Sequence, residues 1–527
     1  MQPQTADPRK RTHQSPERKR RVKPPRVRAP RWEGVHARPA LVHPAEPLPS
    51  EPPNETVINI ESIRQPTPLR PTHRMGEVAH RFGLLLETTA QRILEPTELR
   101  LGRGRIVLLL GPSGSGKSTA LSEIARQRCG GLDVERVTFP TDRSVIDAVC
   151  PNEPLPRALE LLSACGLGES PLWIRRSTEL SDGQRFRARL ARAIGLHYRG
   201  RSAAPLFCDE FCSGLHRRLA KAVAYNLRKL ATRHQLSMVL SSSNDDVVAD
   251  LQPDVLVRFL GRGRCEVRRQ SPRRKPVSFR RRLHIEPGCK ADYDAFAAMH
   301  YRATDELGFV DKIYVMRDRR PRVRNGSETS GADLLGIVVY SHGPLELALR
   351  NQATGGRYVR NPRRLNREVR ILRRLVIHPD VRGCGLGHWL VQKTLPLVGV
   401  AKVECLAAMG EVNPVFEKAG MVRVGTCAVP PERAGIADQL RAMDVDPFAR
   451  DFVAQVARRP KVRRLVARLV YDWYLATTAG GEKRVERQSP EFLAQTFRNL
   501  IGSRPVYYLW QRPAGRKPAR RPRRRVA

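Results

Sequence analysis

The 527-residue sequence lacks any long apolar run. A helix that crosses a bilayer needs about 18 consecutive apolar residues, and no stretch of the chain approaches that length. The N-terminus also lacks the apolar segment that follows the first charges of a signal peptide. We therefore expect neither a membrane-embedded nor a secreted protein.

The cysteines lack the spacings of a zinc knuckle or a disulfide framework. All ten fall at irregular positions without a CxxC pair, and Cys208 and Cys212 lie in a strand-like run. Reduced, mostly buried thiols in a cytoplasmic protein fit this pattern.

Acidic residues are scarce, since 52 Asp and Glu stand against 95 Lys and Arg and leave a formal net charge of +43. A chain with this charge repels itself unless polyanions neutralise it, so nucleic acid, RNA or a ribonucleoprotein, is the expected partner. A basic protein on a membrane surface is the competing interpretation. Hydrophobic residues make up 40% of the chain, enough to build cores, which excludes a chain disordered throughout.

Composition divides the chain into two folded bodies with basic tails. Residues 1–54 and 512–527 are rich in Arg, Lys and Pro, and we expect them to be disordered. The alternative for both is a solvated tail without a specific partner. Residues 263–277 are charged, contain proline and are typical of a linker. We expect an α/β domain at 55–262 and an α+β domain at 278–511, with a helical insertion at about 428–503.

A glycine-rich loop follows the apolar run Arg105–Leu110, matches GxxxxGK[ST] and precedes a stretch with helical spacing. Its glycines let backbone N–H groups approach phosphates, and the helix N-terminus adds partial positive charge. Lys117 would reach the outer phosphates and Ser118 would ligate Mg²⁺. The candidate nucleotide-binding residues of this loop are Gly111, Pro112, Ser113, Gly114, Ser115, Gly116, Lys117, Ser118 and Thr119.

Two carboxylates follow the second apolar strand, Pro205–Cys208. A parallel sheet would place Asp209 and Glu210 beside the phosphates, because ligands bind at the carboxyl ends of its strands. Asp209 would then hold Mg²⁺ through water, and Glu210 would polarise the attacking water. Between this strand and the glycine-rich loop, the sequence LSDGQ from Leu180 opens an amphipathic basic helix.

With these elements in this order, residues 57–260 resemble the ABC-type ATPase family, whose LSGGQ signature differs from LSDGQ only at Asp182. In that family, the signature of one subunit caps the γ-phosphate bound by the P-loop of another. The resemblance therefore implies ATP binding in a homodimer, with Ser181, Gly183 and Gln184 at the nucleotide. Since spanning segments are missing, we expect a soluble machine acting on nucleic acid, without a membrane subunit.

Several positions depart from the family pattern. Phe211 replaces a proline, His216 replaces an aspartate, and Asn244 stands where the family has a switch histidine. Residues 139–142 also contain no clear glutamine. These departures make nucleotide binding a firmer expectation than fast hydrolysis.

A second glycine-rich loop opens a helix after the strand predicted at Arg370–Ile377. Such a loop suits a pyrophosphate held by successive backbone N–H groups. Its candidate ligand-binding residues are Arg382, Gly383, Cys384, Gly385, Leu386 and Gly387.

This loop, together with the strand Val403–Met409 and the motif NPVFEKAGM, resembles the GNAT N-acetyltransferase family. The resemblance implies that the loop binds the coenzyme A pyrophosphate of acetyl-CoA, that the preceding strand splays from its neighbour to hold the pantetheine, and that Asn413 belongs to the site. The tyrosine that often protonates the departing thiolate is replaced by Phe416. The closing strand of such a domain is expected at PVYYLWQ, beyond the helical insertion.

Glu368, at the start of the central strand, is the candidate base for acyl transfer, because a carboxylate there could accept a proton from an attacking amine. The alternative is a surface carboxylate that neutralises Arg367 and Arg370. In the insertion, Arg459, Lys461, Arg463 and Arg464 are candidate RNA or DNA contacts, or else solvated arginines on a helix.

Together these features predict an α/β P-loop ABC-type ATPase domain followed by a GNAT-fold α+β domain, with disordered basic tails. The first hypothesis is an acetyl-CoA-dependent N-acetyltransferase that acts on RNA or a nucleic-acid-associated target, with ATP hydrolysis driving substrate engagement. A second is an ATP-gated nucleic-acid clamp whose GNAT module binds CoA without catalysis. A third is a protein N-acetyltransferase.

Overall fold

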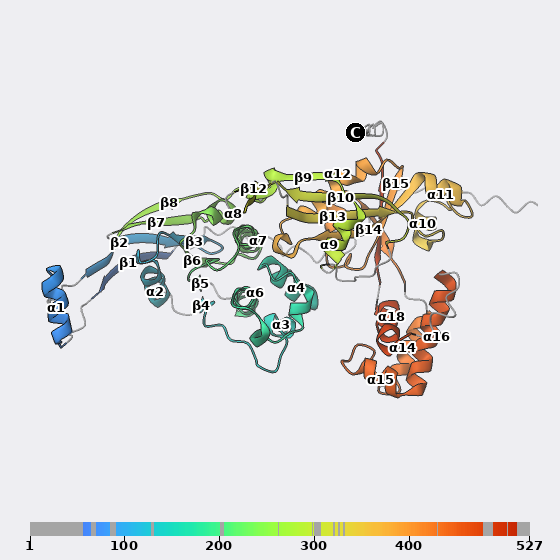
Figure 1. Cartoon of the computed structure of the whole chain (residues 1–527), viewed down its shortest axis with the longest axis horizontal. Helices are drawn as coiled ribbons and strands as arrows, with labels where there is room; N and C mark the ends of the chain where they lie inside the picture. Colours follow the sequence, from blue (N-terminus) through green and yellow to red (C-terminus); the bar gives the residue numbers. More distant parts are fainter. Residues whose placement is uncertain are drawn as a thin grey trace, which may run out of the picture. The chain divides into compact units, whose positions relative to one another are not determined.

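The computed structural model describes residues 56–64, 70–84, 91–127, 131–200, 205–261, 263–297, 299, 307–319, 322–324, 327–329, 333–428, 431–477, 488–502 and 504–513 (Figure 1). All of them belong to one compact unit, Asn54–Ala527. The predicted basic arm at 1–54 lies outside the described residues, and so does the predicted tail from residue 514 onward.

A six-stranded sheet forms the centre of the first part of this unit. Its strand order is β4-β5-β6-β3-β7-β8, from β4 (Leu132–Asp133), β5 (Leu206–Cys208), β6 (Met238–Ser242), β3 (Ile106–Leu110), β7 (Val255–Gly261) and β8 (Arg264–Arg269). Only β8 is antiparallel to its neighbour, and the other pairs are parallel. Strand β3 is buried at every position, because a parallel sheet is covered on both faces and needs continuous apolar strands.

Helices pack on both faces of this sheet (Figure 1). The core on one face includes residues of α7 (Arg217–His234) and of a group of four helices, α3 (Val145–Val149), α4 (Leu155–Ala164), α5 (Ser170–Trp173) and α6 (Asp182–Gly200). On the other face, α2 (Lys117–Gln127) packs with the antiparallel pair β1 (Thr56–Arg64) and β2 (Gln91–Leu101), which flank α1 (His73–Phe82). Helix α8 (Val248–Leu251) precedes β7.

The predicted linker is partly a strand. Residues 264–269 form β8, which pairs with β7 at the edge of the first sheet. The sequence RCEVRR was misjudged as linker because a charged edge strand presents few apolar residues, and here Cys265 and Val267 are the two that pack on the core.

A seven-stranded sheet forms the second part. Its order is β16-β17-β15-β14-β13-β10-β9, from β16 (Val422–Thr426), β17 (Val506–Gln511), β15 (Lys402–Ala407), β14 (Val369–Ile377), β13 (Asp333–Ser341), β10 (Val310–Asp318) and β9 (Leu283–Pro287). The helices of this part are α9 (Lys290–Ala297), α10 (Ala348–Ala353), α11 (Pro362–Glu368), α12 (Leu386–Thr394) and α13 (Val415–Lys418). A small hairpin joins β11 (Arg322–Arg324) to β12 (Ser327–Thr329).

The pair β14 and β15 is the one parallel contact in this sheet, and it is short. Pairing runs from Val369 opposite Lys402 to Leu372 opposite Cys405. Beyond that point β14 continues to Ile377 beside β13, while β15 continues to Ala407 beside β17. The two strands therefore part at mid-sheet, and the carboxyl end of β14 leads toward the second glycine-rich loop.

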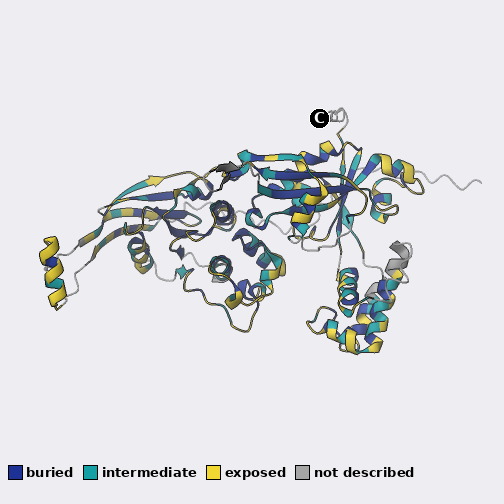
Figure 2. Ribbon diagram, in the orientation of Figure 1, coloured by how far each residue is buried: buried dark blue, intermediate teal, exposed yellow. Residues whose placement is uncertain are grey.

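Between β16 and β17 the chain forms a separate helical cluster from α14 (Pro431–Arg441), α15 (Phe452–Arg458), α16 (Pro460–Thr477) and α18 (Pro490–Gly502). These helices enclose their own core, where the rings of Phe452 and Phe497 lie 5.9 Å apart. Figure 2 shows buried residues where the helices face one another. Helices α15 and α16 are separate because Pro460, which cannot donate a backbone hydrogen bond, begins a new helix. In the described part of the chain, no helix has both the length and the hydropathy required to span a membrane.

Candidate functional site

The first candidate site lies where β3 ends and α2 begins. Gly111 donates its N–H to Ser242 O at 3.3 Å, which links the loop to the end of β6. A side chain at Gly111 would place its Cβ 2.8 Å from Phe259 Cβ, and Gly116 has a φ of +97° close to Ile93. The loop therefore needs glycine at both positions to keep its backbone N–H groups open to a phosphate.

Two side chains of this loop fit an anion. Lys117 is buried, and its Nζ donates to Pro112 O at 2.7 Å, so the ammonium is held over the loop. The hydroxyl of Ser115 is buried without a hydrogen-bond partner. A buried hydroxyl without a partner is uncommon in proteins, and a phosphate oxygen would satisfy it. The residues present therefore fit the phosphates of ATP.

Asp209 completes the site from the end of β5. Its carboxylate accepts hydrogen bonds from Ser241 Oγ and, at 3.0 Å, from the Glu210 N–H. Burial raises the pKa of Asp209, but hydrogen bonds from Ser118, Ser241 and Glu210 and the charge of Lys117 outweigh it and lower the pKa. Asp209 is thus an ionised carboxylate beside a hydroxyl, which suits Mg²⁺ as the sequence predicts. The described residues contain no cluster of three or more His, Cys, Asp or Glu that could hold a metal.

Glu210 lies immediately beyond this metal position and is exposed. Its φ is +43°, in the left-handed region that non-glycine residues rarely adopt. The backbone is held there by hydrogen bonds from the Glu210 N–H to Ser241 Oγ at 3.1 Å and from the Phe211 N–H to Ser241 O at 2.6 Å. Residues in such strained backbone conformations are found mainly at functional sites. At Glu210 this conformation means that the chain no longer follows the direction of β5. The role of Glu210 toward the attacking water stays a prediction.

The signature residues lie at the start of α6. Gln184 Oε1 accepts from the Ser181 N–H at 3.0 Å, and the Gln184 N–H donates to Ser181 Oγ at 3.4 Å. This reciprocal pair caps the helix, while Asp182 is fully exposed and pairs with Arg185. Ser181 is exposed and Gly183 is half-buried. The first turn is therefore available to a ligand brought by another subunit.

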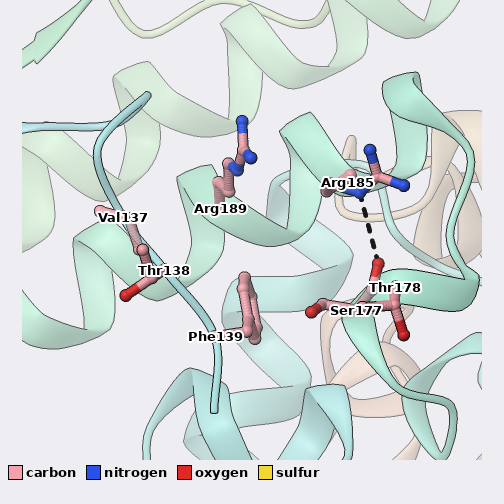
Figure 3. Close-up of a pocket in the computed structure, with 7 residues that line it drawn as sticks. All are labelled: Val137, Thr138, Phe139, Ser177, Thr178, Arg185 and Arg189. Atoms are coloured by element: carbon pink, nitrogen blue, oxygen red, sulfur yellow. Dashed lines mark hydrogen bonds between the residues drawn. The ribbon is translucent and has the colours of Figure 1, made fainter. Parts of the chain in front are cut away.

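The sequence did not reveal a cavity of about 390 Å³ between α6 and the segment after β4 (Figure 3). It borders the region where no glutamine was found. Arg185 Nε donates to Ser177 O at 3.4 Å across it, and Arg192 lies over the Phe139 ring at 5.3 Å. The cavity is lined by Val137, Thr138, Phe139, Ser177, Thr178, Arg185 and Arg189.

The second candidate site lies between η4 (Pro379–Val381) and α12. Gly383 and Gly385 have φ values of +82° and +78°, so both adopt the left-handed conformation that glycine tolerates. Cys384 and Leu386 are buried and anchor the loop, while Gly385 and Gly387 are half-buried. The first-turn N–H groups of a helix have no acceptor within the helix, so this end of α12 can bind an anion.

The Arg382 side chain contacts backbone carbonyls of three other segments. Its guanidinium donates to Ile377 O and Met299 O, each at 2.9 Å, and also to Gly168 O. The guanidinium is thus occupied by backbone carbonyls and fastens the loop. The RxxGxG spacing does not predict that the Arg382 guanidinium lies between these separate segments of the chain.

The Glu368 carboxylate accepts more hydrogen bonds from charged and polar groups than is expected for a catalytic base. It accepts hydrogen bonds from Arg357 at 3.0 Å, Arg364 at 3.2 Å and the Tyr358 hydroxyl at 3.2 Å. Burial raises the pKa of Glu368, but these three donors lower it to about 2. A carboxylate with so low a pKa is a poor proton acceptor near neutral pH, so these contacts weigh against the predicted role.

Near the motif NPVFEKAGM, Asn413 is exposed and its N–H donates to Met409 O at 2.9 Å. Phe416 is buried, with its ring 5.5 Å from that of Tyr508 on β17. The Tyr508 hydroxyl donates to Glu417 Oε1 and Gly410 O, each at 3.1 Å. A tyrosine therefore lies beside the position where Phe416 replaces one, but it comes from a distant part of the sequence.

The chain is similar to known proteins over most of their length, as two examples show. The chain is 31% identical over 233 residues to the aliphatic sulfonates import ATP-binding protein SsuB 2 of Streptomyces avermitilis, covering 40% of this chain and 87% of that protein. It is 29% identical over 199 residues to the protein of the same name from Nocardia farcinica, covering 34% and 80%. No family model matches the chain.

Shorter or more distant matches accompany these. The tylosin resistance ATP-binding protein TlrC of Streptomyces fradiae is 35% identical over 115 residues, covering 19% of this chain and 21% of that protein. A solved dimeric bacterial ABC transporter cassette is 18% identical, covering 35% of this chain and 93% of that chain, with a TM-score of 0.28.

Proposed function

The chain belongs to the ATP-binding cassette (ABC) ATPases, and from this premise we propose that it is an ATP-dependent, acetyl-CoA-using N-acetyltransferase. The nucleotide would bind at the first sheet and acetyl-CoA at the second, and both sheets occur in one compact unit. RNA or a nucleic-acid-associated molecule would carry the accepting nitrogen. ATP hydrolysis would drive engagement of that substrate.

One observation carries the acetyltransferase proposal: β14 and β15 run parallel only from Val369 to Leu372 and then separate. The resemblance to GNAT enzymes predicts a splay at this strand, with the pantetheine and thioester held in it. The glycine-rich loop Gly383–Gly387 follows the same strand and opens α12, in the order that a pyrophosphate site requires.

At the nucleotide, we propose a separate role in ATP hydrolysis for each of the predicted site residues. Lys117 would neutralise the outer phosphates, and Ser118 and Asp209 would hold Mg²⁺. Glu210 would orient the water that attacks the γ-phosphate. Ser181 and Gln184 hydrogen-bond to each other at the start of α6, and we propose that they meet the nucleotide of a second copy in a homodimer.

In the acetyl-transfer step, the accepting nitrogen would attack the thioester carbonyl, the C–S bond would break, and CoA would leave as the thiol. Acetyl-CoA supplies the activated acyl group for this exchange. The first-turn N–H groups of α12 would hold the pyrophosphate, and the nitrogen's proton must pass to a base other than a carboxylate as strongly paired as Glu368. Asn413 remains a candidate for contact with acetyl-CoA.

A basic face on the helical insertion supports a nucleic-acid target. Arg458, Lys461, Arg464 and Arg468 are exposed and make no ion pair within the described residues. Of the other predicted contacts, Arg459 donates to Met443 O and Gln455 Oε1 and Arg463 is half-buried, so they contribute less to this face. Unpaired cations on one face suit the phosphate backbone.

The alternative is an ATP-gated nucleic-acid clamp in which the second sheet binds CoA without catalysis. The hydrogen bonds of Glu368 with Arg357 and Arg364 favour this alternative, because they give the candidate base a structural role. A protein N-acetyltransferase is the third possibility. The relatives named as import ATP-binding proteins suggest a further partner, a transport complex, which the basic face does not favour.

Transfer of label from [¹⁴C]acetyl-CoA tests these alternatives with purified protein, ATP and Mg²⁺. Total RNA, DNA and basic protein are offered separately as acceptors. Label in RNA supports the proposal, and label in protein alone favours the third possibility. Calorimetric binding of acetyl-CoA without any transfer favours the clamp, whereas absence of binding rejects an acetyl-CoA site.

A further inference from the structure

Helix α7 of the ATPase part touches the glycine-rich loop of the second sheet. Asn226 Nδ2 donates to Arg382 O at 3.1 Å, and Lys229 Nζ donates to Gly383 O at 2.7 Å. A side chain on Gly383 would bring its Cβ within 2.6 Å of Asn226. The loop that would bind acetyl-CoA is therefore braced by residues of the nucleotide-binding part.

The contact is a packed interface. Ala222 of α7 is buried in the same hydrophobic cluster as Cys384 and Leu386 of the loop, and the Cys384 thiol donates to Ala222 O at 3.9 Å. One turn earlier, Arg218 forms an ion pair with Asp333 of β13 at 2.8 Å. Two parts of a chain that share a hydrophobic core and buried polar contacts move together more than parts joined by a polar surface.

The contacts with α7 also determine which way the N–H groups of the loop point. In a trans peptide the C=O and the following N–H point opposite ways. When the carbonyls of Arg382 and Gly383 point to α7, the N–H groups of Gly383 and Cys384 point away from it. Asn226 and Lys229 thus hold the loop with those donors turned to the opposite side, free to meet a diphosphate.

Positive charge gathers at the same end of α12. Burial lowers the pKa of His388, and the charges of Lys418, Arg280 and Lys229 lower it further, as expected when three cations lie near one another. Arg280 also lies over the Trp389 ring at 4.8 Å. These cations come from three different elements, and their common neighbour is the first turn of α12.

The other end of α7 lies close along the chain to the carboxylates of the nucleotide site. The helix begins at Arg217, shortly after Asp209 and Glu210. Arg217 Nε donates to Asp246 at 2.9 Å, and Lys221 Nζ lies 3.6 Å from the same carboxylate. Asp246 follows β6, whose last residue, Ser242, accepts the Gly111 N–H of the P-loop. A rearrangement around a bound nucleotide would therefore be passed to α7 through the end of β6.

We propose that Asn226 and Lys229 are positioning residues of the acetyl-CoA diphosphate site, and that α7 couples ATP binding to acetyl-CoA binding. This inference rests on the proposed acetyltransferase function. Each ligand would change the affinity of the other by the same factor, as linkage requires.

Lys229→Met tests the positioning role in the full chain. We expect acetyl-CoA affinity, measured by calorimetry, to fall about tenfold, the usual effect of losing a hydrogen bond to a charged group. Lys229→Arg should restore most of it. Arg233→Met is the control, since it removes a cation from the same helix where the guanidinium pairs with Glu160 of α4, and it should leave acetyl-CoA affinity unchanged.

Coupling is measured by titrating acetyl-CoA with and without a non-hydrolysable ATP analogue and Mg²⁺, and by the reverse titration. We expect the two ratios of dissociation constants to agree, at about fivefold or more, and to fall toward one in Lys229→Met and Asn226→Ala with their melting temperatures retained. Wild-type ratios of one overturn the coupling, and unchanged acetyl-CoA affinity in Lys229→Met overturns the positioning role. If the wild type binds no acetyl-CoA, the proposed function itself fails.

Discussion

At the scale of single residues, the nucleotide site depends on a buried ammonium that has no carboxylate partner of its own in the loop. Lys117 Nζ is held by Pro112 O, a neutral acceptor, so its full charge is available to phosphate. The residue is 9% exposed, and this burial strengthens the attraction.

Lys117→Ala should therefore weaken ATP binding by about ten- to a hundredfold, the range for a lost hydrogen bond to a charged group. Nucleotide-dependent dimerisation should disappear with it. Fluorescence titration with a labelled ATP analogue and light scattering measure the two effects. Arg126→Ala, an exposed residue of the same helix, is the control, and equal ATP affinity in Lys117→Ala and wild type would remove the P-loop assignment.

Glu210→Gln separates the two carboxylates of the ATPase site. The substitution removes the carboxylate expected to orient water and leaves Asp209 and Ser118 for Mg²⁺. We expect ATP to remain bound in a stable dimer, while phosphate release falls at least a hundredfold, which is about 3 kcal/mol of barrier. In Asp209→Asn, by contrast, the Mg²⁺ dependence of ATP binding should weaken. Unchanged phosphate release in Glu210→Gln would show that another group acts on the water.

Glu368 yields a prediction about stability and pH. Its pKa in the folded state is about 2, below the ordinary 4.5, so the folded state is favoured above about pH 4.5 and that contribution is lost as the pH falls toward 2. Glu368→Gln should lower the free energy of unfolding at pH 7 and reduce its decline between these pH values. Urea unfolding at several pH values measures this. Loss of acetyl transfer with unchanged stability would instead restore Glu368 as the base.

At the scale of elements, the strand, glycine-rich loop and helix are used twice, once from β3 to α2 and once from β14 to α12. The two loops differ in the groups that they present to the proposed ligands. The first contains a buried lysine and a buried serine hydroxyl, and the second presents backbone N–H groups with cations around them.

Gly387→Glu should therefore abolish acetyl-CoA binding and leave ATP binding intact, because a carboxylate in the first turn of α12 repels the pyrophosphate. A Cβ at this position would lie 3.2 Å from Val415 Cγ2, so some loss of stability is also expected. Gly387→Ala adds the same Cβ without the charge and serves as the control. Calorimetry that finds equal acetyl-CoA affinity in all three proteins would reject this site.

At the scale of the whole molecule, the excess of positive charge is the feature from which we predict a polyanionic partner. Part of it lies in the tails outside the described residues, and another part is exposed on α16 of the helical insertion. That face can be altered without touching either candidate site.

Lys461→Gln/Arg464→Gln/Arg468→Gln should weaken RNA binding and flatten the slope of log K against log salt by roughly 2 to 3, since each phosphate contact contributes about 0.7 to 0.9. Preference among RNA sequences should change little, because phosphate contacts carry no sequence information. The control replaces Arg100, Arg126 and Arg268, three exposed arginines that are each paired with a glutamate. Equal salt slopes in the two triple variants would show that charge alone, and not this face, governs binding.

The sequence by itself determined the features that arise within a short stretch of chain. Both glycine-rich loops, the carboxylates after β5 and the strand at Val506–Gln511 could be read from it because hydrophobic spacing and glycine act locally. The charged strand β8 was misread because its local composition suggested a linker.

Only the tertiary structure decided which distant groups meet. It brought Ser118 to Asp209 through the order of β3, β6 and β5, engaged Glu368 with three donors, and turned Arg382 toward carbonyls instead of a ligand. It also set Lys229 against Gly383, 154 residues further along the chain. The hydrophobic periodicity of the sequence does not predict such a contact, because hydrogen bonds and packing between remote elements depend on how the sheets and helices are assembled.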